Sequence, residues 1–214
     1  MNISNKIILL SGDASFRKFY RTKKSILVYS PREKKNNLLI YDAINKVLIK
    51  NKIKAPKLIK QKYIKNYIEI EDLGKNSIYK KLKKKSSNKM KYYKKIILLL
   101  CKLQKIKTKK IKTFINTNYF IPKYSNAKLF NESKLFLQWY VPKVINKKRQ
   151  IKVKNKLKNI IKILLSKIKN KNNIFVHRDF HVSNLMENRN KIAIIDNQDA
   201  LFGNSAYDLA SLID

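Results

Sequence analysis

The ten residues VHRDFHVSNL, from Val176 to Leu185, decide the fold of this sequence. The chain has 214 residues but only 2 histidines, and both of them, His177 and His181, lie in this segment. The segment starts as a short apolar run and then becomes polar, which is typical of a strand that ends in a loop. We therefore expect the chemically capable residues of this chain to gather here.

A second short apolar run, in KIAIIDNQDA at 191–200, ends in Asp196 and Asp199. The two strands would bring Asp179, Asn184, Asp196 and Asp199 to one edge. The spacing H-R-D-x-x-x-x-N suits phosphoryl transfer from ATP, which needs a carboxylate that accepts the proton of the attacking hydroxyl. It also needs oxygen ligands for Mg²⁺. Asp179 is therefore the predicted catalytic base, and Asn184 and Asp196 are the predicted metal ligands.

The other polar residues near this motif allow more than one role. His177 is expected to hold the loop against the strand that carries the metal ligand. His181 either packs the loop or reaches toward substrate or phosphate, and Asp199 either supports the site or caps a turn. Ser205 and Asp208 form SAYD, a capping-box-like start for a final helix, so a structural role is favoured for Asp208.

The composition is strongly basic, with 51 Lys and Arg against 13 Asp and Glu and a formal net charge of +38. Such a charge permits nucleic-acid binding. Lysine, asparagine and isoleucine are nevertheless enriched along the whole chain, as a bias of the coding sequence would produce, whereas a dedicated surface would show a local basic block. We therefore predict no specific nucleic-acid partner.

Length and apolar segments point to a cytoplasmic protein without a membrane anchor. A chain of this length can bury most of its apolar surface as one domain or as two packed lobes. The run NKIILL near the start is too short for a signal peptide, and no run is long enough to cross a bilayer. Cys101 has no other cysteine to pair with and is expected to be a small core residue.

The periodicity of apolar residues changes after Gly74. The first part predicts strands at 7–10, 16–21, 26–29, 55–61 and 66–74, with one helix at 33–50. The second part predicts a buried helix at 86–107 that is apolar nearly all round and is capped by Ser86 or Ser87. An amphipathic helix at 151–168 is expected to bury its apolar stripe inside the protein, although such a helix could also lie on a membrane. The Lys- and Asn-rich stretches 105–112 and 146–156 are expected to be loops.

Four segments together resemble the aminoglycoside phosphotransferase and choline kinase superfamily. They are LLSGDASFRKFYR (9–21), IEDLG (70–74), VHRDFHVSNLM (176–186) and IIDNQDALFGNSAYDLASLI (194–213). Within that superfamily they are most similar to the bacterial kinases that phosphorylate the anomeric hydroxyl of N-acetylmuramate and N-acetylglucosamine in cell-wall recycling. The resemblance implies an α+β, protein-kinase-like fold with two lobes. Residues 1–73 would form a small antiparallel-sheet lobe for the nucleotide, and residues 74–214 a mainly helical lobe with the catalytic loop.

The resemblance also implies which residues bind ATP and the acceptor. The loop SGDAS and the hinge would bind the nucleotide through Gly12, Ser15, Arg17, Glu71 and Leu73. The implied cofactors are ATP and Mg²⁺, and the implied partner is a small sugar bound by a monomeric enzyme. His181, Glu132 and Trp139 are predicted to bind that sugar. Glu132 and Trp139 are seven residues apart and can share one helical face, although Trp139 can equally be an ordinary core residue.

Three departures from the family pattern keep other functions open. The subgroup usually has Phe where this chain has Asn197, so an apolar anchor behind the metal ligand is expected to be lost. Tyr29 stands where a protein kinase has its phosphate-pairing lysine. The sequence ends at Asp214, inside the expected final helix, which predicts an incomplete helical lobe. The alternatives are a kinase of a choline-like or aminoglycoside hydroxyl, or an inactive relative that binds nucleotide or RNA.

Overall fold

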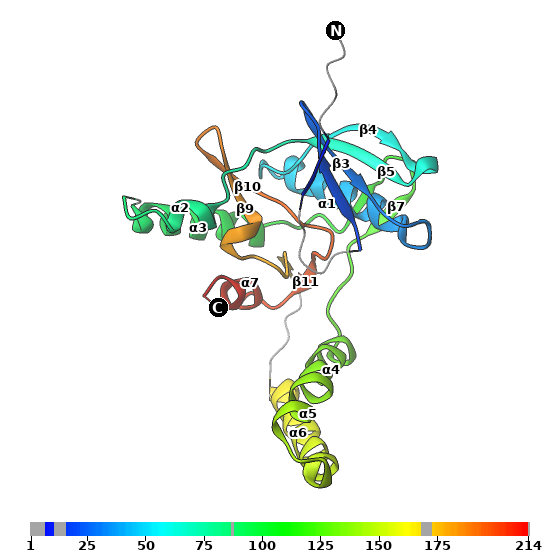
Figure 1. Cartoon of the computed structure of the whole chain (residues 1–214), viewed down its shortest axis with the longest axis vertical. Coiled ribbons are helices and arrows are strands. Elements are labelled where there is room, and N and C mark those ends of the chain that lie inside the picture. The colour runs from blue at the N-terminus through cyan, green and yellow to red at the C-terminus, as the bar shows by residue number, and fades with distance from the viewer. Residues whose placement is uncertain (1–6, 11–15, 87, 168–172, 214) are drawn as a thin grey trace.

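The computed structural model describes residues 7–10, 16–86, 88–167 and 173–213. Its N-terminal part is a five-stranded antiparallel sheet with the order β1-β2-β3-β5-β4. The strands are β1 (Ile8–Leu10), β2 (Lys18–Arg21), β3 (Ser25–Tyr29), β4 (Leu58–Lys62) and β5 (Tyr67–Glu71). Helix α1 (Asn36–Lys50) lies against this sheet (Figure 1). The predicted strand–strand–strand–helix–strand–strand order is confirmed.

The sheet and α1 form one core because their apolar residues face each other. Alternate residues of β3 and β5 point to the same side of the sheet. On that side Val28 and Ile68 are completely buried, and they pack with Leu38 and Tyr41 of α1. The apolar residues that recur at every second position of the strands thus pack against those that recur at every third or fourth position of the helix.

A short connection leads from β5 into the remaining part of the chain. Gly74 has φ +96°, a backbone conformation that residues with a side chain rarely adopt, and no heavy atom lies within 4 Å of where its Cβ would be. The 3-10 turns are Arg32–Lys34, Tyr63–Lys65 and Val182–Asn184, and the helices that follow the connection are α2 (Ile78–Leu82) and α3 (Lys89–Gln104). The cap of α3 is Asn88, whose side chain accepts from the Lys91 backbone N–H, rather than the predicted Ser86; Ser87 lies outside the described residues.

Three antiparallel strand pairs and a last helix complete the body of the molecule. The pairs are β6 (Lys110–Lys112) with β7 (Asn118–Phe120), β8 (Ile174–Val176) with β11 (Leu201–Gly203), and β9 (Leu185–Asn188) with β10 (Lys191–Ile194). Helix α7 spans Tyr207–Ile213. One buried apolar cluster joins Ile44 of α1, Ile96 of α3, Phe175 of β8 and Phe202 of β11. This shared cluster fixes the sheet part relative to the strands that carry the catalytic motif.

The segment from Asn126 to Lys167 forms a helical arm that stands away from this body (Figure 1). It contains α4 (Asn126–Leu135), a π-helical turn (Phe136–Tyr140), α5 (Val141–Val144) and α6 (Lys147–Lys167). Helix α6 packs on α4 and α5. None of the described helices of the chain is long and apolar enough to cross a membrane.

The structure corrects four expectations about the helices. Helix α3 is amphipathic, because Ile96, Leu100 and Leu103 are its only buried residues while Leu98 is 71% exposed. Cys101 lies outside the buried stripe and is exposed. Helix α6 has no fully buried residue: Leu157, Ile161 and Leu165 of its expected apolar stripe are half-buried, whereas Ile160 and Leu164 are exposed. The stretch 147–156, expected to be a loop, is the start of α6, whereas in 105–112 only the strand Lys110–Lys112 departs from the expected loop.

Candidate active site

A cavity of about 540 Å³ lies where the sheet, the connection after β5 and the catalytic loop meet. Apolar residues of β1, β3, β5 and β9 form its walls. The loop after β8 and Asp196 form its polar end. The lining includes six residues predicted to bind nucleotide, metal or substrate or to act as the base, namely Glu71, Leu73, Asp179, His181, Asn184 and Asp196. Segments distant in sequence therefore surround one space.

The predicted base and the first metal ligand touch each other at the polar end of this cavity. The side-chain amide of Asn184 donates to Oδ2 of Asp179 over 2.7 Å and to the Asp179 carbonyl over 3.1 Å. The other oxygen of Asp179 lies 3.1 Å from Nε2 of His181. Because Asn184 uses its nitrogen in these bonds, its amide oxygen is left for another partner.

His177 is completely buried and orients the catalytic loop through both ring nitrogens. Nδ1 accepts from the backbone N–H of Asp179 at 3.2 Å, so Nε2 carries the hydrogen. Nε2 then donates to the carbonyl of Ile195 at 3.1 Å and to Oδ1 of Asn197 at 2.9 Å. The structural role predicted for His177 therefore has a geometric basis: the ring bridges the catalytic loop and the segment after β10.

Asp208 supports the same loop from α7. Its buried carboxylate accepts from the backbone N–H groups of His177, at 2.7 Å, and Arg178, at 2.9 Å. Burial raises the pKa of Asp208, against the opposing effect of the two donors. The start of α7 is capped instead by Asn204, whose side chain accepts from the backbone N–H of Ala206. Asp208 is thus structural, but it holds the catalytic loop rather than its own helix.

Asn197 replaces the expected apolar anchor with a polar one. Its side chain is completely buried, accepts from His177, and donates to Oδ1 of Asn45 in α1 at 2.8 Å and to the carbonyl of Ile194 at 3.2 Å. A buried amide with partners for both its nitrogen and its oxygen avoids the cost of unsatisfied polar groups. The apolar anchor is therefore absent, as expected, but polar contacts of Asn197 hold the segment behind Asp196 in its place.

Arg17 reaches Asp196 from the other end of the sequence. Its guanidinium lies 2.9 Å from Oδ1 of Asp196, bonds to Gln198, and lies 5.5 Å from the ring centres of both Phe19 and Tyr41. Arg17 itself is buried, whereas the side chain of Asp196 is partly exposed to the cavity. A cation thus stands at the predicted metal ligand even though β3 carries Tyr29 in place of the kinase lysine. The sequence suggested Arg17 near phosphate but not this pairing.

A second ion pair that sequence reasoning missed closes the connection after β5. Arg21 of β2 makes a bidentate contact with Asp72, at 2.7 and 2.9 Å, and donates to the carbonyl of Gly74. Asp72 also accepts from the backbone N–H of Gly74 at 2.8 Å. The signal for this pair was the IEDLG segment, whose aspartate could have been matched to the second arginine of SFRKFYR.

Glu71 and Leu73 occupy different positions around this connection. The carboxylate of Glu71 lies 3.8 Å from Nζ of Lys54, while Leu73 is buried with Met186 and Ala193. In the described part of the chain, the backbone N–H of Leu73 donates to no other group, although its carbonyl accepts from Asn188. An unpaired backbone donor at the edge of an apolar cavity suits a planar heterocycle such as adenine.

The two residues predicted for the acceptor from the helical arm do not line the cavity. Glu132 bonds to Arg178 at 2.7 Å and to the hydroxyl of Tyr124 at 2.9 Å, so it contacts the residue next to the predicted base, Asp179. Trp139 is 69% exposed, which rules out the core alternative. The π-helical turn Phe136–Tyr140, which contains Trp139, widens the helix and changes the spacing on which a shared face was predicted. Gly12 and Ser15 lie outside the described residues.

The oxygens left at the polar end fit a hard divalent cation. Asn184 offers its amide oxygen, and Asp196 offers the carboxylate oxygen that Arg17 does not hold. Magnesium is commonly held by one or two protein oxygens plus substrate phosphates and water. The described residues contain no cluster of three His, Cys, Asp or Glu side chains, so the site does not resemble an all-protein metal cage.

Comparison with known proteins also indicates a phosphotransferase. Residues 6–214 match the model of the phosphotransferase enzyme family. An N-acetylmuramate/N-acetylglucosamine kinase of Neisseria meningitidis is 34% identical over 93 residues, covering 44% of this chain and 28% of that protein. The enzyme of the same name from Pseudomonas aeruginosa is 23% identical over 97% of this chain and 59% of its own length. The chain thus spans less than two thirds of the curated relatives it matches.

A solved structure shares the fold. The aminoglycoside phosphotransferase APH(2'')-Ib in its ADP-bound form aligns with a TM-score of 0.68 at 15% identity, over 96% of this chain and 70% of that one. This likeness confirms the kinase-like α+β fold that the motifs predicted. Since the family model covers nearly the whole sequence, this chain belongs to the phosphotransferase enzyme family.

Proposed function

We propose that this protein transfers the γ-phosphoryl group of ATP to the anomeric hydroxyl of an amino sugar, N-acetylmuramate or N-acetylglucosamine. One observation carries the proposal: Asp179, Asn184 and Asp196 line one cavity, whose other end is an apolar slot beside the connection after β5. This is the set of groups that phosphoryl transfer requires. The names of the two bacterial relatives support the choice of acceptor.

The residues of the chain would act as follows. Asp179 accepts the proton of the attacking sugar hydroxyl through Oδ1, since its Oδ2 is occupied by the Asn184 amide. His181, 3.1 Å from the same oxygen, orients the hydroxyl or the carboxylate. The backbone N–H of Leu73 would hold the adenine ring. Arg17 keeps Asp196 in place and adds positive charge at the phosphate end.

Asn184 and Asp196 would hold Mg²⁺, which neutralises phosphate charge when it is bound. We also propose that residues 1–73 serve the nucleotide and residues 74–214 the acceptor and the catalytic loop. Gly12 and Ser15 would cover the phosphates, while Glu132 and Trp139 would contact the sugar from the arm. We also propose that the protein is cytoplasmic and monomeric.

The test combines turnover with nucleotide binding. The chain is incubated with Mg²⁺, ATP and either sugar, and the products are identified by phosphorus NMR; both sugars should yield the 1-phosphate. Asp179→Asn should reduce turnover by about 10²–10⁴-fold, because the general base is lost, and leave ADP affinity in calorimetry within about twofold. Mg²⁺ should increase the ADP affinity of the unmodified chain but not that of Asp196→Asn, because the variant lacks one predicted metal ligand.

Choline and an aminoglycoside serve as control acceptors and should not react. Phosphate on the 6-hydroxyl, or turnover of a control acceptor alone, would discard the anomeric acceptor and keep the kinase. Equal loss of ADP affinity in both variants would contradict the separate roles of base and metal ligand.

A further inference from the structure

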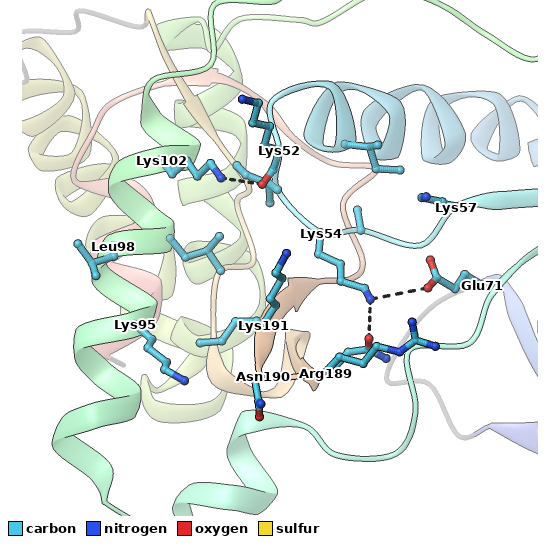
Figure 2. A pocket seen from close by; sticks show the side chains of 16 residues that line it. Lys52, Lys54, Lys57, Glu71, Lys95, Leu98, Lys102, Arg189, Asn190 and Lys191 are labelled. Carbon is cyan, nitrogen blue, oxygen red and sulfur yellow. Dashed lines mark hydrogen bonds and ion pairs between the residues drawn. The ribbon is translucent and has the colours of Figure 1, made fainter.

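A second cavity, of about 940 Å³, lies outside the candidate active site and shares only Glu71 with its lining. Its walls come from the segment 52–57 between α1 and β4, from α3, and from the turn between β9 and β10 (Figure 2). These elements belong to both the sheet part and the part after Gly74. The size falls within the range of small-molecule sites, about 300–1,000 Å³.

Basic side chains are the most frequent kind among the residues that line this cavity. Seven of its 16 lining residues are Lys or Arg and one is acidic, whereas the whole chain has 51 basic residues in 214. The basic residues are Lys52, Lys54, Lys57, Lys95, Lys102, Arg189 and Lys191. Figure 2 shows Lys191 between the 52–57 segment and α3, while Lys54 of that segment points toward Glu71. Several positive charges therefore share one concave space.

Only part of this charge is balanced by the protein. Lys54 lies 3.8 Å from Glu71 and bonds to Asn188, and Lys102 donates to the carbonyl of Lys52 at 2.6 Å (Figure 2). The described residues provide no hydrogen bond or ion pair for the amino groups of Lys52, Lys57 and Lys191. The repulsion among these groups would be relieved by a bound anion.

The turn between β9 and β10 holds its part of the wall in a fixed geometry. Arg189 and Asn190 have φ +48° and +63°, as in the two-residue turns that fit the twist of a hairpin. This turn places Lys191 at the start of β10, opposite Asn188. On the α3 side, Leu98, which is exposed, and Leu99 add an apolar surface beside Lys95 and Lys102.

Basic density by itself does not identify a site in this chain. Helix α6 also carries many lysines, but it is an exposed helix, and water screens charges on such a surface. Charges that line a cavity act together, because the low-dielectric walls focus their field on the space between them. The concave shape, rather than the number of lysines, separates this cavity from the general excess.

We propose that this cavity binds a small anion that carries several phosphate groups. Lysines are compact charges that suit phosphates approaching from different directions. The cavity has room for a di- or triphosphate with an organic part on Leu98 and Leu99. This site is independent of the proposed phosphoryl transfer, because its lining contains neither Asp179 nor Asp196.

Inorganic tripolyphosphate is the probe, titrated by calorimetry at about 50 mM salt, where screening is moderate. The double variant Lys52→Gln, Lys191→Gln should bind it about tenfold more weakly, because two unpaired charges leave the cavity. The matched control Lys152→Gln, Lys156→Gln removes the same charge from α6 and should change the affinity less than twofold. The two double variants should unfold at the same urea concentration, which shows that the fold is intact in both.

Equal weakening in the two double variants, or no saturable binding to the unmodified chain, would overturn the proposal. A single-stranded uridine oligonucleotide distinguishes a nucleic-acid surface, and we expect both variants to weaken it to the same small extent. The proposal would also be overturned if the variant Lys52→Gln, Lys191→Gln lost affinity for the oligonucleotide but kept its affinity for tripolyphosphate.

Discussion

Single residues under the catalytic loop fix the position of Asp179. Arg178 has φ +78°, and its strained backbone is held by the carboxylate of Asp208, which accepts two adjacent N–H groups. His177 and Asn197 continue these contacts to the segment after β10 and to α1. A buried network of this kind specifies one arrangement only while every member has its partners.

Asp208→Asn tests the support of the loop. The amide oxygen can accept one of the two N–H groups well, and its nitrogen would face a donor, so we expect about 1–3 kcal/mol less stability at neutral pH. Urea unfolding of both proteins measures the difference.

The pH dependence of that difference follows from the pKa of Asp208, which burial raises above its usual 3.8. The native state then binds the proton more tightly than the unfolded state, so the contribution of Asp208 is largest below the unfolded pKa. It falls as the pH rises toward the folded pKa. The gap between unmodified protein and variant should therefore shrink as the pH rises from about 4. If the stability difference grows with pH instead, the two N–H donors lower the pKa of Asp208 more than burial raises it.

At the scale of elements, the strand pair β8–β11 is the platform for the catalytic motif. Gly203 of β11 pairs with Ile174, and a Cβ added there would lie 3.0 Å from the ring of Tyr124 and 3.0 Å from a methyl group of Val176. Tyr124 in turn bonds to Arg178. Close packing, rather than a turn, therefore explains this glycine.

Gly203→Ala should lower the free energy of unfolding by about 1–3 kcal/mol, because the added methyl overfills a packed space. Gly74→Ala is the matched comparison: it meets no atom, and its cost of about 1–2 kcal/mol comes from the backbone at φ +96°. Near-ultraviolet circular dichroism should report a disturbed tyrosine environment only for Gly203→Ala. A neutral Gly203→Ala would show that the strand pair adjusts freely.

On the scale of the whole molecule, buried apolar clusters and ion pairs between distant segments hold a highly charged chain together. The ion pairs Arg17–Asp196 and Arg21–Asp72 join the residue before β2 and the end of β2 to later segments. The shared apolar cluster joins α1 to α3 and β8. The net charge of +38 opposes this compact state by self-repulsion.

Added salt should therefore stabilise the protein. Raising NaCl from about 20 to 300 mM shortens the screening length from about 20 to 6 Å, and we expect the melting temperature to rise by several degrees. KCl should give the same rise, because screening depends on ionic strength and not on the cation. A fall or no change would mean that attractive pairs dominate the electrostatics.

The sequence alone determined the strands of the first part, the helices α1 and α3, and the chemical motif. The alternation of apolar residues, the spacing from His177 to Asn184 and the glycine after the IEDLG strand are local patterns, and local patterns suffice to predict strands, turns and the residues at their ends. The catalytic base and both metal ligands were predicted in this way, and the structure brings all three to one cavity.

Only the tertiary structure decided which faces are covered and which distant residues meet. Arg17 and Asp196 are 179 positions apart, and Asn45 and Asn197 are 152 apart, so no local pattern links them. The apolar stripes of α3 and α6 have the period of a helix, but the period does not say whether a neighbour packs on each face. Leu98 of α3 and Ile160 and Leu164 of α6 are therefore exposed where burial was expected, because packing depends on the arrangement of all elements together.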